Sequence, residues 1–264
     1  MSVFSSSVSA ASVAARLRAA GCVFAEDEAR LLLSSAHTAA ELEAMIGHRV
    51  AGEPLEHVVG WAEFCGLRVA VDPGVFVPRP RTEFLVQRAA ALAREAAGAP
   101  VVLDMCCGTG AMGLALAARL GRAELHAADL DPVAVRCARR NLPAGRVYEG
   151  DLYDPLPASL RGLVEILIAS PPYVPSQSIG LLPPEARLHE PRLALDGGGD
   201  GLDVVRRVIA GASEWLAPGG HLLVETSERQ AEATVRAVAE AGLVARAEVS
   251  DERDATAVIG TRTS

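Results

Sequence analysis

The clearest indication of the fold is the segment Val101-Val-Leu-Asp-Met-Cys-Cys-Gly-Thr-Gly-Ala-Met-Gly113. Its apolar residues lead through Asp104 into a turn that contains Gly108 and Gly110, and a helical pattern follows. In an open α/β sheet, ligands bind at the carboxyl ends of the strands, where glycines let the backbone approach a bound molecule closely. The stretch therefore indicates a strand, a ligand-binding turn and a helix, although the same pattern also occurs in ordinary tight connections.

Strand-like and helix-like segments alternate after residue 80, which predicts a parallel sheet covered by helices. The predicted strands are 101–104, 123–129, 146–150, 164–169, 221–226, 243–249 and 256–260. The predicted helices are 81–97, 111–120, 133–141, 202–216 and 229–241. Residues 251–254 leave no room for a crossover helix between the last two strands, so these should pair antiparallel. The predicted fold class is α/β, with a seven-stranded, mostly parallel sheet that ends in an antiparallel hairpin.

The chain before residue 79 has a different pattern. Residues 7–50 predict three short amphipathic helices, and Thr38 with Glu41 forms a capping box at the start of the third. From residue 52 to residue 77, short β-prone runs around glycines predict a hairpin. We therefore divide the chain into an N-terminal helical bundle (1–51), a linking β-hairpin (52–78) and a ligand-binding domain (79–264).

Composition excludes several classes of function. Every basic residue in the 264-residue chain is arginine, so enzymes that need a Schiff-base or Walker lysine are excluded. The net charge of −8 opposes binding to nucleic acid through its phosphates. The five cysteines include no C-x-x-C pair and the histidines lack metal-ligand spacing, so we expect neither a disulfide framework nor a metal site. Without a spanning apolar run or a signal peptide, we expect a cytoplasmic protein that does not contact membranes.

Carboxylates follow the next two predicted strands. Asp129 comes about 20 residues after the glycine turn, where a carboxylate can accept from both hydroxyls of a ribose. Asp151 could accept from an adenine amino group while Leu152 packs on the ring, but an aspartate that only caps a turn is equally common. The turn lacks the full G-x-G-x-x-G pattern for a pyrophosphate, and Asp104 suits a cationic ligand. These features favour S-adenosylmethionine over NAD.

The most specific motif is Ser170-Pro171-Pro172-Tyr173, at the end of the fourth predicted strand. Its two prolines fix the backbone and leave carbonyl oxygens that can accept, while Tyr173 offers an aromatic face. The motif matches the [N/D/S]-P-P-[Y/F/W] pattern of methyltransferases that act on planar amino or amide nitrogens. Diproline is also common in surface loops, but here it follows three other elements in the right order. We therefore predict these four residues to be catalytic.

Together these motifs resemble the HemK/PrmC family of protein-glutamine methyltransferases, over nearly the whole chain. The resemblance also rests on four segments: Val77-Pro-Arg-Pro-Arg-Thr-Glu83, similar to the family's I-P-R-P-x-T-E linker; Glu190-Pro191; Ala194–Asp203; and Pro218-Gly-Gly220 with Glu225. It implies a class I methyltransferase-like Rossmann fold in which residues 79–264 bind S-adenosylmethionine. It further implies a protein substrate, for this family a peptide-chain release factor with a Gly-Gly-Gln loop.

The resemblance also implies the site. The cofactor-binding residues would be Phe76, Pro78, Arg79, Asp104, Cys106, Cys107, Gly108, Thr109, Gly110, Asp129, Asp151, Leu152 and Ser170. Of these, the turn from Cys106 to Gly110 would line the methionine and ribose part, and Asp129 would hold the ribose. Leu152 would lie near the adenine, and the segment from Ser170 to Tyr173 would receive the glutamine side chain. Its amide NH2 would donate to the Ser170 hydroxyl and the Pro171 carbonyl.

The sequence departs from the family pattern at two positions. The family has glycine where Cys106 stands, which is tolerable if Cys106 keeps ordinary backbone angles. Cys106 and Cys107 are either two small residues in a turn, which is the more common case, or a redox-active vicinal pair. The family has Asn where Ser170 stands, and a serine hydroxyl offers less hydrogen bonding than a carboxamide. A nucleic-acid amino-methyltransferase, a non-catalytic cofactor-binding protein and, more distantly, an NAD-dependent dehydrogenase therefore stay open as alternatives.

Overall fold

A seven-stranded sheet organises the larger part of the residues that the computed structural model describes, which are 9–93 and 98–263. The strands lie in the order β5-β4-β3-β6-β7-β9-β8. Their bounds are β3 Val101–Met105, β4 Glu124–Asp129, β5 Arg146–Glu149, β6 Val164–Ala169, β7 Leu216–Thr226, β8 Val244–Ser250 and β9 Ala255–Thr261. Only β9 runs antiparallel, to both β7 and β8. The predicted α/β class and antiparallel last hairpin are confirmed.

The strand order reverses between β3 and β6, which pair with each other in parallel. Chain connections leave these two strands toward opposite edges of the sheet, and this divergence opens a crevice at their carboxyl ends. The glycine turn follows β3 and the Ser-Pro-Pro-Tyr motif follows β6. The topology alone therefore brings these two motifs side by side.

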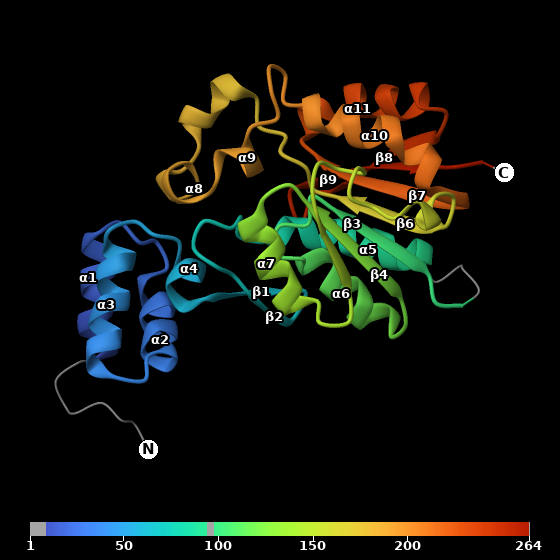
Figure 1. Cartoon of the computed structure of the whole chain (residues 1–264). Coiled ribbons are helices and arrows are strands. Elements are labelled where there is room, and N and C mark those ends of the chain that lie inside the picture. Colours follow the sequence, from blue (N-terminus) through green and yellow to red (C-terminus); the bar gives the residue numbers. More distant parts are fainter. Residues whose placement is uncertain (1–8, 94–97, 264) are drawn as a thin grey trace.

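Helices cover both faces of this sheet (Figure 1). On one face, α5 (Glu83–Ala93), α6 (Ala111–Leu120) and α7 (Pro132–Asn141) pack on strand residues such as Val102 and Ile166. On the other, α10 (Asp203–Trp215) packs on Leu103 and Leu167, with α11 (Glu228–Glu240) beside it. Successive strand residues thus alternate between two cores, as the period of a β-strand requires. The continuous apolar runs of β3 and β6 reflect burial on both faces.

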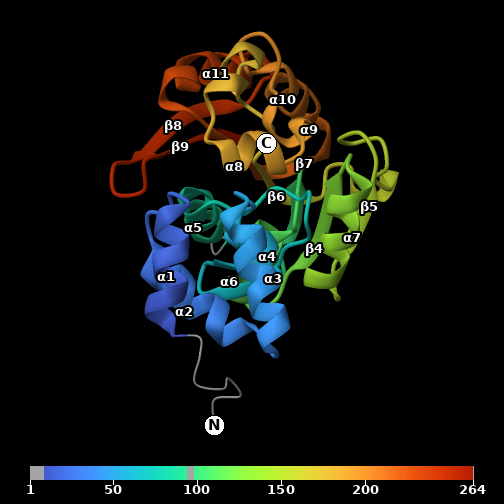
Figure 2. The same ribbon diagram turned by 90° about the vertical axis from the view of Figure 1, so that its left-hand side faces the viewer.

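The N-terminal bundle consists of α1 (Ala10–Ala19), α2 (Ala25–Ser35) and α3 (Ala39–Val50), which share a core of their own. It lies beside the part of the chain that contains the seven-stranded sheet, as Figures 1 and 2 show. Thr38 caps α3 as predicted, because its side chain accepts from the Glu41 amide at 3.1 Å. The Glu41 carboxylate, however, accepts from the amide of His37 at 2.7 Å, one residue before the cap.

The link between the two parts contains a hairpin, as predicted, of β1 (Trp61–Phe64) and β2 (Leu67–Ala70). It also contains a short helix that the sequence analysis missed, α4 (Leu55–Val59), which Pro54 opens and Gly60 ends in a left-handed conformation. Proline before a helix and glycine after it were visible signals. The run between them is too short to show helical periodicity.

Most boundaries predicted after residue 80 fall within one residue of those observed, but the starts of two elements differ by more. The predicted helix 81–97 opens as a 3-10 turn, Pro80–Thr82, before α5, and its end at 94–97 lies outside the described residues, as do residues 7 and 8 of the first predicted helix. Strand β7 begins at Leu216, five residues early, because Gly219 and Gly220 exchange backbone hydrogen bonds with Arg262 and so continue the pairing. The described part of the chain contains no helix with the length and apolarity needed to cross a membrane.

The segment between β6 and α10 carries the 3-10 turn Ser176–Leu181 and two short helices, α8 (Pro184–His189) and α9 (Arg192–Leu195). A further 3-10 turn, Ala158–Leu160, precedes β6. Arg49 ties α8 to the bundle: its guanidinium donates to Glu28 at 2.7 Å and to Glu185 at 2.6 Å. Arg49 and Glu28 are both buried, whereas Glu185 is exposed. The bundle and the segment after the motif are therefore coupled through one buried cation.

We expect Arg49→Met to lower the free energy of unfolding by about 3 kcal/mol, because it leaves the buried Glu28 carboxylate without its partner. Urea unfolding measures this. Arg16→Met is the matched control, since the Arg16–Glu43 pair is about half exposed and should contribute less than about 1 kcal/mol. Equal effects of the two substitutions would contradict the structural role assigned to Arg49.

Candidate active site

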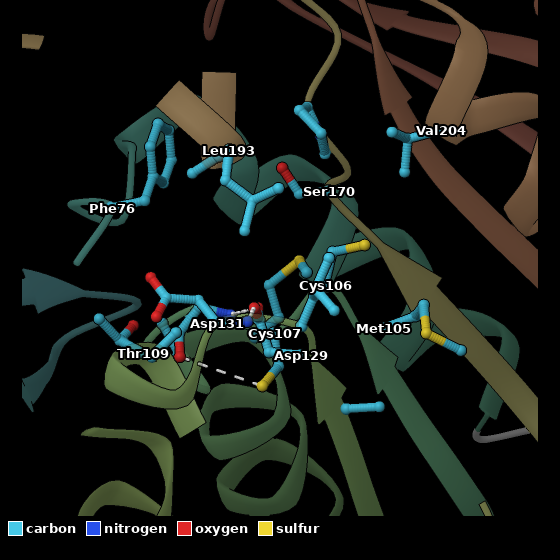
Figure 3. A pocket seen from close by; sticks show the side chains of 18 of the residues that line it. Phe76, Met105, Cys106, Cys107, Thr109, Asp129, Asp131, Ser170, Leu193 and Val204 are labelled. Carbon is cyan, nitrogen blue, oxygen red and sulfur yellow. Dashed lines mark hydrogen bonds between the residues drawn. The ribbon is translucent and has the colours of Figure 1, made fainter. Parts of the chain in front are cut away.

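A first pocket lies at the carboxyl ends of β3 and β4 and beside that of β6. Eleven of the thirteen predicted cofactor-binding residues line it: Phe76, Pro78, Arg79, Cys106, Cys107, Gly108, Thr109, Asp129, Asp151, Leu152 and Ser170. Figure 3 shows Asp129 and Asp131 on one side of this pocket and Phe76, Leu193 and Ser170 on the other. The other two predicted residues, Gly110 and Asp104, do not line this pocket.

Asp129 fixes the shape of the glycine turn. One carboxylate oxygen accepts from the Gly108 amide at 2.8 Å and the other from the Asp131 amide at 2.9 Å. Burial raises the pKa of Asp129, and these two amides act in the opposite direction. Each oxygen keeps a lone pair for a further donor. Asp129 thus joins the turn after β3 to the end of β4 and lines the pocket with acceptor capacity to spare.

The backbone conformation of Cys106 differs from the one expected. It was expected to keep ordinary backbone angles, but its φ of 56° lies in the left-handed region that favours glycine. The turn geometry therefore suits the family's glycine better than this cysteine. The left-handed conformation of Cys106 raises the free energy of the folded state. The side chain of Cys106 packs on the α10 core and that of Cys107 on the α6 core, so the two thiols lie on opposite sides of the sheet.

Asp104 lies fully buried beneath the turn. Its Oδ2 accepts from the Gly113 amide at 2.8 Å, which holds the first turn of α6, while its Oδ1 has no hydrogen-bond partner among the described residues. Burial raises the pKa of Asp104 to about 8, and nearby Asp129 adds to this rise. In the cofactor-free protein this carboxyl is therefore mostly protonated at neutral pH, and a positively charged ligand beside it would favour its ionised form.

The two residues predicted to contact an adenine, Asp151 and Leu152, both line the first pocket. The Asp151 carboxylate accepts from Arg207 of α10 at 2.7 Å, so it is already paired with a cation. Leu152 is buried and adopts a left-handed φ of 48°. Val204, also from α10, lines the same wall. Sequence analysis missed the contribution of α10, because nothing in its amphipathic pattern sets these residues apart.

A second pocket adjoins the first and is lined by three of the four motif residues, Ser170, Pro171 and Tyr173, whereas Pro172 lines the first pocket. The walls of the second pocket come from the linker after β2, from α4 and from α8. Four residues line both pockets: Phe76, Arg79, Ser170 and Ala194. The two pockets therefore meet at the first residue of the motif.

The carboxylate of Glu225, at the end of β7, holds the motif in place. Its Oε2 accepts from Thr82 at 2.6 Å and from the Ser170 hydroxyl at 3.1 Å. Its Oε1 accepts from the Tyr173 hydroxyl at 3.2 Å and from Arg81 at 3.3 Å. Arg81 also donates to the Tyr173 hydroxyl at 2.7 Å. Burial, followed by the nearby Glu225 carboxylate, raises the pKa of Tyr173, so its hydroxyl keeps its proton at neutral pH.

The glycines of the run 197–201 let the chain wrap closely around the motif. A Cβ on Gly197 would lie 2.7 Å from the carbonyl oxygen of Pro172, and one on Gly201 would lie 2.4 Å from that of Tyr173. Gln230 completes the enclosure by donating to the Tyr173 carbonyl at 3.0 Å. The sequence singles out this run only by its resemblance to the family, and the close backbone contacts explain why residues 197 and 201 are glycines. From sequence, Arg81 has no predicted role, and Glu225 is only part of the family match.

The first pocket fits S-adenosylmethionine better than a dinucleotide. Its carboxylates, Asp129, Asp131 and Asp151, suit ribose hydroxyls and positive charge. Its two arginines are already paired, Arg79 with Glu190 and Arg207 with Asp151, so neither is an unpaired cation for a pyrophosphate. Within the described residues, no cluster of three or more His, Cys, Asp or Glu side chains could hold a metal ion.

Comparison with protein families matches residues 66–200 to the methyltransferase small domain. The chain is 37% identical to the release factor glutamine methyltransferase of Geobacter sulfurreducens, over 84% of this chain and 78% of that protein. It is 40% identical to the 4-amino-L-phenylalanine/4-methylamino-L-phenylalanine methyltransferase of Streptomyces pristinaespiralis, over 70% of this chain and 65% of that enzyme. The names of these two relatives give different methyl acceptors.

Among solved structures, the fold resembles that of the Thermus thermophilus 16S rRNA N2 G1207 methyltransferase in complex with AdoMet and guanosine. The TM-score is 0.56 and the sequence identity 20%, and the match covers 76% of this chain and 49% of the other. At this identity the similarity establishes the class I methyltransferase fold.

We expect Cys106→Gly to raise the free energy of unfolding by about 1 kcal/mol, because it removes a side chain from a left-handed position. Cys107→Gly is the matched control: Cys107 is buried and has no positive φ, so its replacement should destabilise the protein. Urea unfolding of both variants measures the difference. A loss of stability in Cys106→Gly would show that the turn does not carry this strain.

The stability of the cofactor-free protein should fall as the pH rises from about 4 to about 8. The folded-state pKa of Asp104, about 8, lies above the ordinary value of 3.8 for an aspartate, so the fold favours the protonated form. The stabilisation is complete below the unfolded pKa and is lost as the pH approaches the folded one, by up to about 1.4 kcal/mol per pH unit. Asp104→Asn should flatten this dependence in urea titrations at pH 5, 7 and 9. An unchanged slope would exclude Asp104 as its source.

Proposed function

Since the chain belongs to the family of release factor glutamine methyltransferases, we propose that it methylates the side-chain amide nitrogen of a glutamine in a peptide-chain release factor. The methyl donor is S-adenosylmethionine, which supplies an electrophilic methyl group on a sulfonium. The enzyme is thus an N-methyltransferase. Its acceptor would be the glutamine of the Gly-Gly-Gln loop that the family resemblance implies.

One observation carries this proposal: the two pockets share a wall at Ser170. A cofactor in the first pocket and a side chain in the second would meet there, each entering from its own side. The second pocket is walled partly by α4 and α8, near the bundle, so a protein loop would reach it along the bundle side of the molecule. This arrangement supports transfer to a macromolecular loop.

The residues around Ser170 would act mainly by positioning. An amide nitrogen is a weak nucleophile because its lone pair is delocalised, so holding it in line with the methyl group supplies much of the rate. Its two N–H groups would donate to the Ser170 hydroxyl oxygen and to the Pro171 carbonyl. These acceptors become more favourable as positive charge develops on the nitrogen. The ring of Tyr173, fixed by Glu225 and Arg81, would pack against the face of the amide.

Removal of the Tyr173 ring tests this role. We expect Tyr173→Ala to lower turnover by about 100-fold, because the amide loses its orienting surface, and to leave the affinity for S-adenosylhomocysteine within about 2-fold. Tyr148→Ala is the matched control, since Tyr148 stacks on His126 at the far edge of the sheet. Equal losses of turnover and cofactor affinity in Tyr173→Ala would mean that the motif serves cofactor binding instead.

The acceptor is identified by labelling. The protein is incubated with methyl-labelled S-adenosylmethionine and, in parallel, with release factor, whole-cell protein extract and total nucleic acid, followed by residue-level mass spectrometry. We expect label on the release-factor glutamine. Label found only in nucleic acid would favour an exocyclic-amine methyltransferase, and cofactor binding without transfer to any acceptor would favour a non-catalytic protein. Either result would overturn the proposal.

A further inference from the structure

The Ser170 hydroxyl carries one proton, and it donates that proton in a hydrogen bond to Glu225. Its Oγ lies 3.1 Å from Glu225 Oε2, a carboxylate oxygen that can only accept. Toward the second pocket, Ser170 therefore presents a lone pair. Pro171 has no N–H and also presents an acceptor. These two groups can accept both N–H bonds of an NH2 group, but neither can donate to the carbonyl oxygen beside it.

A carboxamide substrate brings that carbonyl oxygen with it, and a buried acceptor without a donor costs binding free energy. An asparagine in place of Ser170 would offer both an acceptor and a donor from one side chain. The missing donor must come from another residue that lines the second pocket. The described residues of this pocket include two arginines, Arg79 and Arg81.

Arg81 is the better placed of the two. Its Nε donates to Glu225 and its Nη2 to the Tyr173 hydroxyl, so the guanidinium is held against the same carboxylate that orients Ser170. Its Nη1 makes no hydrogen bond to any described residue, and its side chain is 45% exposed. Arg79, by contrast, pairs with the buried Glu190 and lies over the Phe76 ring. Arg81 also occupies the unspecified position of the I-P-R-P-x-T-E linker motif.

We propose that Arg81 donates through Nη1 to the carbonyl oxygen of the acceptor amide and so supplies the donor that Ser170 cannot. This inference rests on the proposed function and deepens it. Ser170 and Arg81 act as a pair: Ser170 accepts from the NH2 group, and Arg81 donates to the carbonyl oxygen. The site is then selective for carboxamides over amines that lack a neighbouring carbonyl. The positive charge of Arg81 is balanced by Glu225, which limits its repulsion of the developing charge on nitrogen.

A double-mutant cycle on the full chain tests this pair. In the natural background, Arg81→Met should lower kcat/KM for a Gly-Gly-Gln peptide between about 10-fold and 100-fold, because the carbonyl loses a charged donor. In the Ser170→Asn background, the same substitution should cost less than about 3-fold, because the asparagine amide then donates. Arg68→Met is the control, as Arg68 lies over the Trp61 ring in the hairpin, away from both pockets. Equal costs in both backgrounds would overturn the proposal.

A binding measurement keeps the test valid if Ser170→Asn fails to fold or lacks activity. The affinities of a Gly-Gly-Gln and a Gly-Gly-Leu peptide are measured in the presence of S-adenosylhomocysteine. Arg81→Met should weaken only the glutamine peptide, by a similar factor, and leave the affinity for S-adenosylhomocysteine unchanged. An equal effect on both peptides would show that Arg81 only supports the fold of the site. If the natural protein methylates no glutamine at all, the proposed function fails instead, and the two failures are distinguishable.

Discussion

The active site depends on one buried carboxylate. Glu225 lies at the end of β7, where its side chain is 5% exposed, and gathers donors from two segments that are far apart in sequence. Thr82 and Arg81 come from the linker into α5, whereas Ser170 and Tyr173 come from the loop after β6. A buried charge of this kind is tolerated only when its hydrogen bonds are complete. Because it accepts hydrogen bonds from four side chains, the Glu225 carboxylate orients the Ser-Pro-Pro-Tyr motif and joins it to the linker.

The rest of the fold supports this arrangement from both sides. The reversal of strand order between β3 and β6 places the glycine turn beside the motif loop, and Asp129 fixes that turn. The glycine run 197–201 wraps the opposite side of the motif, and α8, tied to the bundle by Arg49, walls the second pocket. The two pockets thus share Phe76, Arg79, Ser170 and Ala194 and differ in the rest of their walls.

Much of this could be predicted from sequence because the signals are local. Strand β6 and helix α6 fall at their predicted residues, since buried apolar runs and a glycine before a helix depend on neighbours in the chain. The cofactor pocket was largely predictable because its residues follow strand ends. The conformation of Cys106 was predicted wrongly: ordinary backbone angles were expected, but this cysteine keeps the left-handed geometry that suits the family's glycine. Arg81, Arg49 and Arg207 look like ordinary surface arginines in sequence, and their partners lie tens of residues away.

If the proposed function holds, cofactor and acceptor occupy separate pockets that meet at Ser170. A crystal structure of the complex with S-adenosylhomocysteine and a Gly-Gly-Gln peptide would show this arrangement. We expect S-adenosylhomocysteine in the first pocket and the glutamine in the second. The amide nitrogen should face the sulfur and donate to Ser170 Oγ and the Pro171 carbonyl. A glutamine side chain outside the second pocket, or S-adenosylhomocysteine lying across both pockets, would contradict it.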